Sequence, residues 1–136
     1  MRIRILIADD DSPIRGLLRR LIEEHAGWEV CGEAENGLDA VAKTDQLAPD
    51  LVVLDLAMPH MNGLQAGRAI AKASPQLPML LLTVQEVSNE LVHEARNAGF
   101  RGAVSKSTGS EVVAGVATLL EQRSFFRSTP SDLSPA

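Results

Sequence analysis

The 136-residue chain is poor in cysteine and in aromatic residues, with one cysteine, one tryptophan, three phenylalanines and no tyrosine. Because Cys31 has no second cysteine to pair with, an internal disulfide is excluded. The apolar runs are short, whereas a membrane-spanning helix needs about 20 apolar residues and a targeting segment also needs a long apolar stretch. We therefore expect a cytoplasmic protein without membrane contact.

The chain also lacks a cluster of basic residues. It has 13 Lys and Arg against 18 Asp and Glu, and its formal net charge is -5. Proteins that bind nucleic acids neutralise phosphates with a basic surface, so direct nucleic-acid binding by this chain is disfavoured. The hydrophobic content of 45% and the charged content of 23% are close to globular averages, which indicates an ordinary folded domain with one core.

What the sequence does have is a regular alternation of short apolar runs with helical patterns. Predicted strands lie at 3–8, 28–32, 51–54, 79–82 and 102–105, and each is followed by apolar residues at helical spacing. Uninterrupted apolar strands are typical of a parallel sheet covered on both faces. We therefore expect an α/β fold, a three-layer (βα)5 sandwich with a parallel five-stranded sheet.

The C-terminal end has a different composition. From residue 124 onward it is rich in Ser and Pro and shows no periodicity. Such segments cannot bury enough apolar surface to fold by themselves. The expected organisation is one domain at 1–123 followed by a disordered tail, or the start of a linker, at 124–136.

Polar residues follow four of the predicted strands. Asp9 and Asp10 follow the first strand, Asp55 the third, Thr83 the fourth and Lys106 the fifth. Ligands of open α/β sheets bind outside the carboxyl ends of the strands, so these side chains are expected to converge. Carboxylates about 4 Å apart repel by a few kcal/mol even at an effective dielectric constant near 20, so the cluster needs a positive charge. A set of oxygen ligands without His or Cys suits Mg²⁺.

This set of residues has the parts for phosphoryl transfer to a carboxylate. Asp55 can attack a phosphoryl group, Mg²⁺ can neutralise charge on its oxygens, and Thr83 and Lys106 can contact the remaining ones. The segment DLVVLDLAMPHMNG at 50–63 and the other strand ends, in this order and spacing, resemble the receiver domain of bacterial two-component response regulators over about residues 2–122. The wording of that segment is most similar to the NarL/FixJ-type branch.

The resemblance implies a function, a strand order and partners. It implies a phosphorylation-switched signalling domain with the flavodoxin-like order 2-1-3-4-5, which catalyses only its own phosphorylation and dephosphorylation. Its phosphodonor would be a sensor histidine kinase, a phosphotransfer protein or a small molecule. Two copies of the chain could also form a homodimer. The implied site residues are Asp55 as phosphoacceptor, Asp9, Asp10, Asp55 and the backbone carbonyl of Ala57 as Mg²⁺ ligands, and Thr83 and Lys106 as phosphate-reading residues.

Each of these residues also has a simpler interpretation. An acidic triplet before a helix is most often a helix cap, Thr83 could bond the backbone, and a lone Lys106 is usually solvated. Together, these interpretations would require every polar strand end to be accidental. The alternative function that stays open is a receiver-like interaction module whose output does not depend on phosphate.

Three positions depart from the common receiver pattern. Ala103 occupies the place, three residues before the lysine, where receivers commonly carry Tyr or Phe, and Ser107 replaces a frequent proline. Val84, next to Thr83, could narrow access to the phosphoryl group. Without the aromatic ring, we expect the signal to leave through loop and helix movements around Thr83 and Lys106, toward a partner face formed by 88–98, the strand near Ala103 and 109–122.

Overall fold

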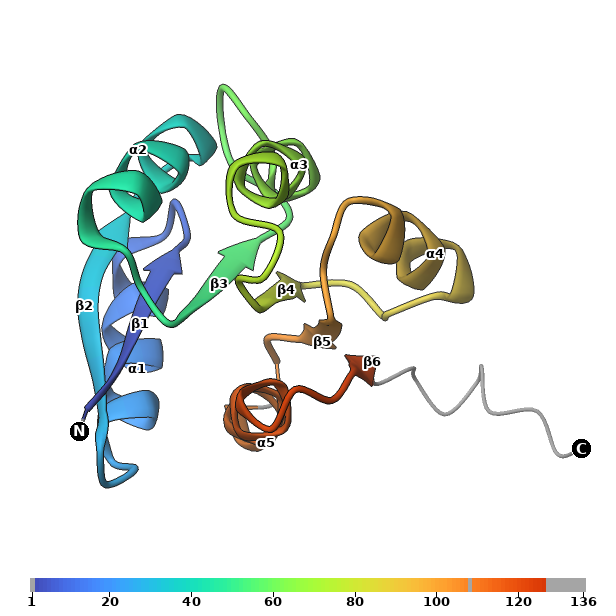
Figure 1. Cartoon of the computed structure of the whole chain (residues 1–136). Helices are drawn as coiled ribbons and strands as arrows, with labels where there is room; N and C mark the ends of the chain where they lie inside the picture. Colours follow the sequence, from blue (N-terminus) through green and yellow to red (C-terminus); the bar gives the residue numbers. More distant parts are fainter. Residues whose placement is uncertain (1, 108, 127–136) are drawn as a thin grey trace, which may run out of the picture.

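The computed structural model describes residues 2–107 and 109–126. Strands and helices alternate along the chain, coloured from blue to red in Figure 1. The elements in chain order are β1 (Ile3–Ala8), α1 (Ser12–Glu23), β2 (Trp28–Ala34), α2 (Gly37–Leu47), β3 (Leu51–Asp55), α3 (Gly63–Ala73), β4 (Met79–Thr83), α4 (Asn89–Asn97), β5 (Gly102–Ser105), α5 (Gly109–Leu120) and β6 (Phe125–Phe126). The predicted α/β class and all five predicted strand-and-helix units are confirmed.

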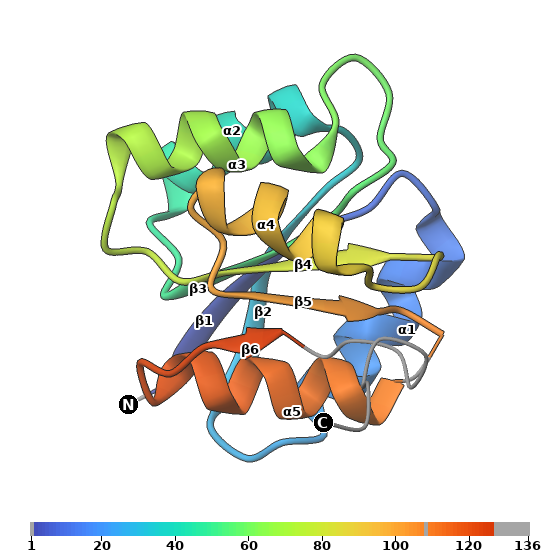
Figure 2. The same cartoon turned by 90° about the vertical axis from the view of Figure 1, so that its right-hand side faces the viewer.

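The strands form one parallel sheet in the order β2-β1-β3-β4-β5-β6. The predicted order of the first five strands is confirmed, but the sheet has a sixth strand at the edge beside β5 (Figure 2). Phe125 and Phe126 lie in the segment for which we expected no regular structure, and there the expectation was wrong. Two residues are too few to show a periodic pattern, and their pairing with β5 is a tertiary contact. Residues 127–136 of the expected tail lie outside the described residues.

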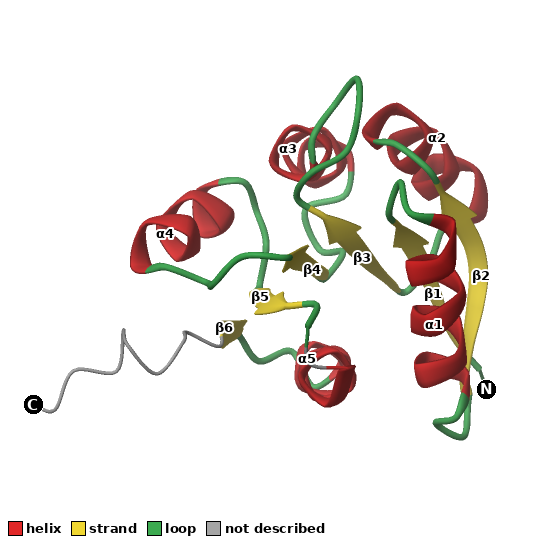
Figure 3. Cartoon of the chain, turned by 180° about the vertical axis from the view of Figure 1, so that it is seen from behind, coloured by secondary structure: helices red, strands yellow, loops and turns green. Residues whose placement is uncertain are grey.

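Helices cover both faces of the sheet and create two apolar layers. Helices α1 and α5 lie on one face, and α2, α3 and α4 lie on the other (Figures 1 and 3). Every residue of β3 and β4 is buried, as expected for central strands between two helical layers. The polar ends of these strands are thus held by a rigid scaffold.

Four helices begin with a side-chain cap after a strand. The Asp11 carboxylate accepts a hydrogen bond from the Ile14 amide and caps α1, with Pro13 in the first turn, where its missing N–H costs nothing. Asn62 and Gln65 form a reciprocal capping box at the start of α3. Asn36 and Ser88 cap α2 and α4. The caps fix the loops that leave the carboxyl edge of the sheet, where the predicted site lies.

None of the helices within 2–107 and 109–126 combines the length and the apolar character required to span a bilayer.

Candidate functional site

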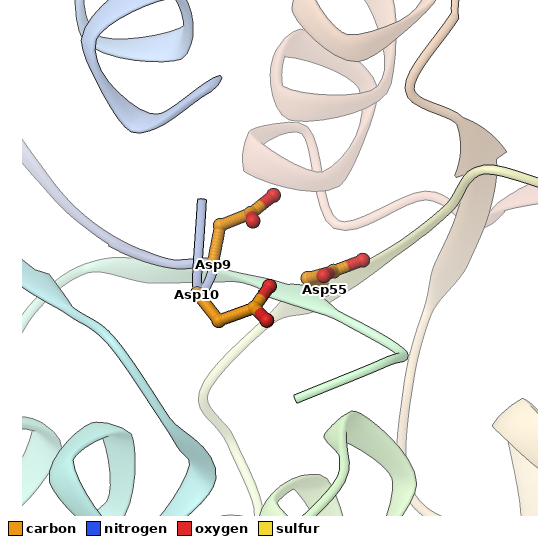
Figure 4. Close-up of side chains that lie close together, drawn as sticks. All are labelled: Asp9, Asp10 and Asp55. Carbon is orange, nitrogen blue, oxygen red and sulfur yellow. The ribbon is translucent and has the colours of Figure 1, made fainter. Parts of the chain in front are cut away.

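Three carboxylates meet at the carboxyl edge of the sheet. Asp9 and Asp10 follow β1 and Asp55 ends β3, and one oxygen from each lies within 4.8 Å of the others (Figure 4). The strands explain this convergence, because β1 and β3 are parallel neighbours in which Ala8 pairs with Leu54. The next residue of each strand is therefore an aspartate at the same edge. The predicted clustering of these three residues is what the structure shows.

The Asp9 carboxylate is fully buried and both of its oxygens are engaged. Oδ1 accepts a hydrogen bond from the Asp11 amide at 2.9 Å, and Oδ2 accepts one from Lys106 Nζ at 2.8 Å. The Asp9 carbonyl accepts a further hydrogen bond from Arg15 Nη1 at 2.6 Å, and Arg15 pairs with Glu33. Asp9 is thus held in one orientation. Asp10 is exposed, and among the described residues no hydrogen bond or ion pair engages its carboxylate.

Lys106 follows β5, two strands away from β3, and reaches the carboxylates along the same edge of the sheet. Its ammonium lies 2.8 Å from Asp9 Oδ2 and 3.3 Å from Asp55 Oδ2, although 97 residues separate it from Asp9. Burial alone would lower the pKa of Lys106, but its hydrogen bond with Asp9 and the charges of Asp55 and Asp9 raise that pKa above its ordinary value. Lys106 is therefore a fixed positive charge beside Asp55.

One ammonium is not enough for three carboxylates. The pKa of Asp55 is raised from 3.8 to about 6, first by burial and then by the charge of Asp9, and Lys106 only partly opposes these two effects. The cluster is thus short of positive charge, and its donor set consists of oxygen atoms. Both properties fit a divalent cation of the Mg²⁺ type, which prefers hard oxygen ligands.

Thr83 and Ala57 lie at the same edge. Thr83 ends β4, is buried, and its hydroxyl accepts a hydrogen bond from the Gln85 amide at 3.1 Å. The Thr83 carbonyl accepts a hydrogen bond from the Lys106 amide at 2.9 Å, which ties β4 to the residue after β5. Ala57 is exposed in the loop after Asp55, and the Val84 side chain is 68% exposed.

The loop between Asp55 and α3 closes tightly over the strand end. The Gly63 amide donates to the Leu56 carbonyl at 2.9 Å, so the chain returns to the strand it has just left. A Cβ atom at Gly63 would collide with the Asp55 carbonyl oxygen. Only glycine allows this close approach of the two backbone segments. Gly63 therefore has a structural role, because it holds the backbone of the candidate nucleophile Asp55 in place.

Sequence reasoning missed one contact at the site and one aromatic ring next to Ala103. Arg15 holds the Asp9 carbonyl, but an arginine in the first turn of a helix has no sequence signal that identifies this contact. Phe126, in β6, pairs in register with Ala103 and lies under the guanidinium of Arg96, whose Cζ is 4.5 Å from the ring centroid. The domain therefore has an aromatic ring beside Ala103 after all, supplied by another strand.

The fold and the site together define a class of protein, the flavodoxin-like α/β domains with a cluster of carboxylates at the carboxyl edge of the sheet. The profile of the response regulator receiver domain matches residues 5–117. The chain belongs to this family, whose members are phosphorylation-regulated receivers of two-component systems. The predicted family resemblance is confirmed.

Individual relatives agree with this assignment. The chain is 38% identical over 110 residues to the transcriptional regulatory protein YdfI of Bacillus subtilis, covering 81% of this chain and 51% of that protein. It is 39% identical over 103 residues to the chemotaxis protein CheY of Thermotoga maritima, covering 76% of this chain and 84% of that protein. The structure of a LuxR-family two-component response regulator from Aurantimonas superposes with a TM-score of 0.89 at 31% identity, covering 96% and 92% of the two chains. The chain thus spans about half the length of YdfI.

The raised pKa of Asp55 predicts a specific pH dependence of stability in the absence of metal. In the folded state Asp55 holds its proton up to about pH 6, whereas its ordinary pKa is 3.8. Below about pH 4 the carboxyl group is protonated in both states and carries no penalty. As the pH rises toward 6 the unfolded state loses its proton first, so the free energy of unfolding falls. The loss is complete only once the pH is well above 6, and two pKa units correspond to about 3 kcal/mol at most.

Asp55→Asn should therefore stabilise the metal-free protein by up to about 3 kcal/mol at pH 7 and by little at pH 4. Denaturant unfolding in a chelator at several pH values measures the difference. Asp45→Asn, at an exposed position of α2, is the matched control and should show no such trend. A difference between Asp55→Asn and wild type that is the same at pH 4 and pH 7 would contradict the assigned cause.

Proposed function

We propose that this receiver accepts a phosphoryl group on Asp55, in a Mg²⁺-dependent reaction, from a sensor histidine kinase, a phosphotransfer protein or a small acyl phosphate. The observation that carries the proposal is the environment of Asp55, a buried carboxylate at a strand end with two further carboxylates and one ammonium around it. The proposal includes a cytoplasmic location, since the donors named here act there.

The transfer needs one bond to form and one to break. An Asp55 carboxylate oxygen forms the new bond to phosphorus, while the bond from phosphorus to the donor's nitrogen or oxygen breaks and the donor keeps the bonding pair. Asp55 must be ionised to attack, and Lys106, at 3.3 Å, favours the ionised form. Lys106 also stays protonated and can then pair with an oxygen of the transferred group.

The Mg²⁺ ligands in this proposal are the carboxylates of Asp9, Asp10 and Asp55 and the carbonyl of Ala57. When bound, the ion would supply positive charge that neutralises the phosphoryl oxygens during transfer. The cluster of carboxylates with one lysine supports this choice, because its charge is uncompensated without a cation. The Asp11 amide and Lys106 keep Asp9 aimed at the cluster.

Thr83 and Lys106 are the residues proposed to read the phosphoryl group. A new anion on Asp55 competes with Asp9 for the Lys106 ammonium and offers an acceptor to the Thr83 hydroxyl. Because the Lys106 amide is bonded to the Thr83 carbonyl, movements of the two residues are coupled. The segments that follow them lead to α4 and α5, which are the proposed route of the signal.

A phosphate-independent interaction module is the rival function, motivated by Ala103. The intact set of charged residues around Asp55 argues against it, since a module without phosphotransfer has no need of buried carboxylates.

The functions of whole relatives, such as transcriptional regulation by YdfI, suggest that this receiver controls an output domain or a separate partner. A homodimer is also part of the proposal.

The test is incubation with a small acyl phosphate in Mg²⁺, followed by mass measurement of the modified peptide. The expected product is one phosphoryl group on the peptide that contains Asp55, formed only when Mg²⁺ is present. Labelling elsewhere, or none, would contradict the proposal. Binding of a partner with and without a phosphoryl mimic then separates the switch from the rival, since only the switch changes its affinity.

A further inference from the structure

The short strand β6 packs in a defined position at the edge of the sheet, beside β5. After α5 the chain reverses at Gln122, whose φ of 62° is in the left-handed region, and runs back beside β5. The Phe125 amide donates to the Arg101 carbonyl at 2.8 Å. Figure 2 shows β6 lying between α5 and β5 on the side of the molecule that also carries α4. The strand therefore covers the edge of the α4-β5-α5 face.

Small residues on β5 and α5 form the surface against which β6 packs. A Cβ atom at Gly102 would lie 2.6 Å from the Phe125 carbonyl oxygen, and one at Gly115 would lie 3.1 Å from Phe125 Cδ2. Ala103 pairs with Phe126 in the sheet. Larger residues at Gly102 or Gly115 would push β6 away, so the strand depends on this particular surface.

The two phenylalanines contact different helical layers. Successive residues of a strand point to opposite faces, and Phe125 packs against the core layer under α5, whereas Phe126 packs against the layer under α4. Arg96, in the last turn of α4, lies over the Phe126 ring. Phe126 is thus held by β5 and by α4 at the same time.

The position of Phe126 connects β6 with the two proposed phosphate-reading residues, Thr83 and Lys106. Thr83 lies six residues before α4, and Lys106 directly follows β5, so a movement of either reaches one of the two elements that hold Phe126. Both rings of β6 are only half-buried, and the strand has two residues. Such a short element has little stability of its own and responds to small displacements of its neighbours.

We propose that β6 is a strap over the α4-β5-α5 face and that phosphorylation of Asp55 loosens it, with Phe126 as the ring that senses the shift between α4 and β5. Release of β6 exposes the β5 edge at Gly102 and Ala103. This inference rests on the proposed phosphorylation of Asp55. It assigns to Phe126 a role that a ring on β5 itself cannot have here, because residue 103 is alanine.

Hydrogen exchange of the full chain, with and without beryllofluoride and Mg²⁺, tests the strap. The expected result is faster exchange of the Phe125 amide with the mimic, by at least about fivefold, the lower end of typical coupling between sites. The loops at 58–63 and 83–89 should respond as well, and they report that the mimic has bound. If these loops respond and the Phe125 amide is unchanged or slower, the strap is wrong while the proposed function stands. Silent loops would overturn both.

Two variants test the reciprocal effect. Coupling between two sites acts equally in both directions, so Phe126→Ala, which weakens the docking of β6, should tighten binding of the mimic by up to the factor by which the mimic loosens β6. Arg96→Gln, which removes the charge over the ring, should give a smaller change of the same sign. Arg68→Gln, at an exposed position of α3, is the control and should bind the mimic as wild type does. Unchanged affinity in Phe126→Ala, with α4 still protected from exchange, would overturn the proposal.

Discussion

Replacing Asp55 with asparagine is expected to abolish phosphorylation of the chain by a small acyl phosphate. Asparagine keeps the shape of the side chain but has no carboxylate oxygen able to form an acyl phosphate. The variant should stay folded, because it removes a buried negative charge that stands among other carboxylates. Mass measurement of intact protein after incubation in Mg²⁺ measures the loss.

The matched control for this experiment is Asp45→Asn, which removes a carboxylate from the exposed surface of α2 and should be labelled like wild type. Sensitivity of the product to hydroxylamine shows that the bond is an acyl phosphate. Full labelling of Asp55→Asn would mean that another side chain is the acceptor and that the assignment is wrong.

The second large effect is expected for Mg²⁺ binding by Asp10→Asn. Asp9 already has the Asp11 amide and Lys106 on its two oxygens, whereas Asp10 is exposed and has its carboxylate available. We expect Asp10 to supply much of the attraction for the ion. Even loss of a partner outside the ligand sphere typically costs about 10- to 100-fold in metal affinity, so loss of a direct carboxylate ligand should cost at least as much.

Asp11→Asn provides the control, because it removes the same charge one residue away and asparagine can still cap α1. Calorimetric titration of both variants with Mg²⁺ should show a large loss in Asp10→Asn and a small one in Asp11→Asn. Equal affinities in the two variants would show that the site binds the ion through general negative charge and that Asp10 is not a ligand.

The sequence predicted the strands and the grouping of the polar strand ends, because these features follow from patterns of neighbouring residues. The apolar runs of β3 and β4 identify buried parallel strands because every side chain on them faces a helical layer. Once these strands are placed, parallel pairing brings their polar ends to one edge, which is why Asp9, Asp55 and Lys106 could be grouped in advance.

The parts that could not be predicted depend on exact tertiary position. The sequence does not show that burial separates Asp9 from Asp10, because that difference arises from the ammonium of Lys106 donating to the buried Asp9 carboxylate. The β6 strand escaped prediction because two residues carry no pattern. Phe126 could be found only by its pairing with Ala103, which depends on the reversal of the chain after α5.

The order of the strands has a consequence for how the chain can assemble during synthesis. The first three strands form β2-β1-β3, and β4, β5 and β6 are then added one after another on the same side. Each new strand covers the open edge of the previous one, so the sheet can grow in the order in which the ribosome delivers it. A nascent chain that ends before Phe125 would still present the unpaired edge of β5, which can pair with another chain. Pairing of Phe125 and Phe126 with Gly102 and Ala103 then covers the first half of this β5 edge.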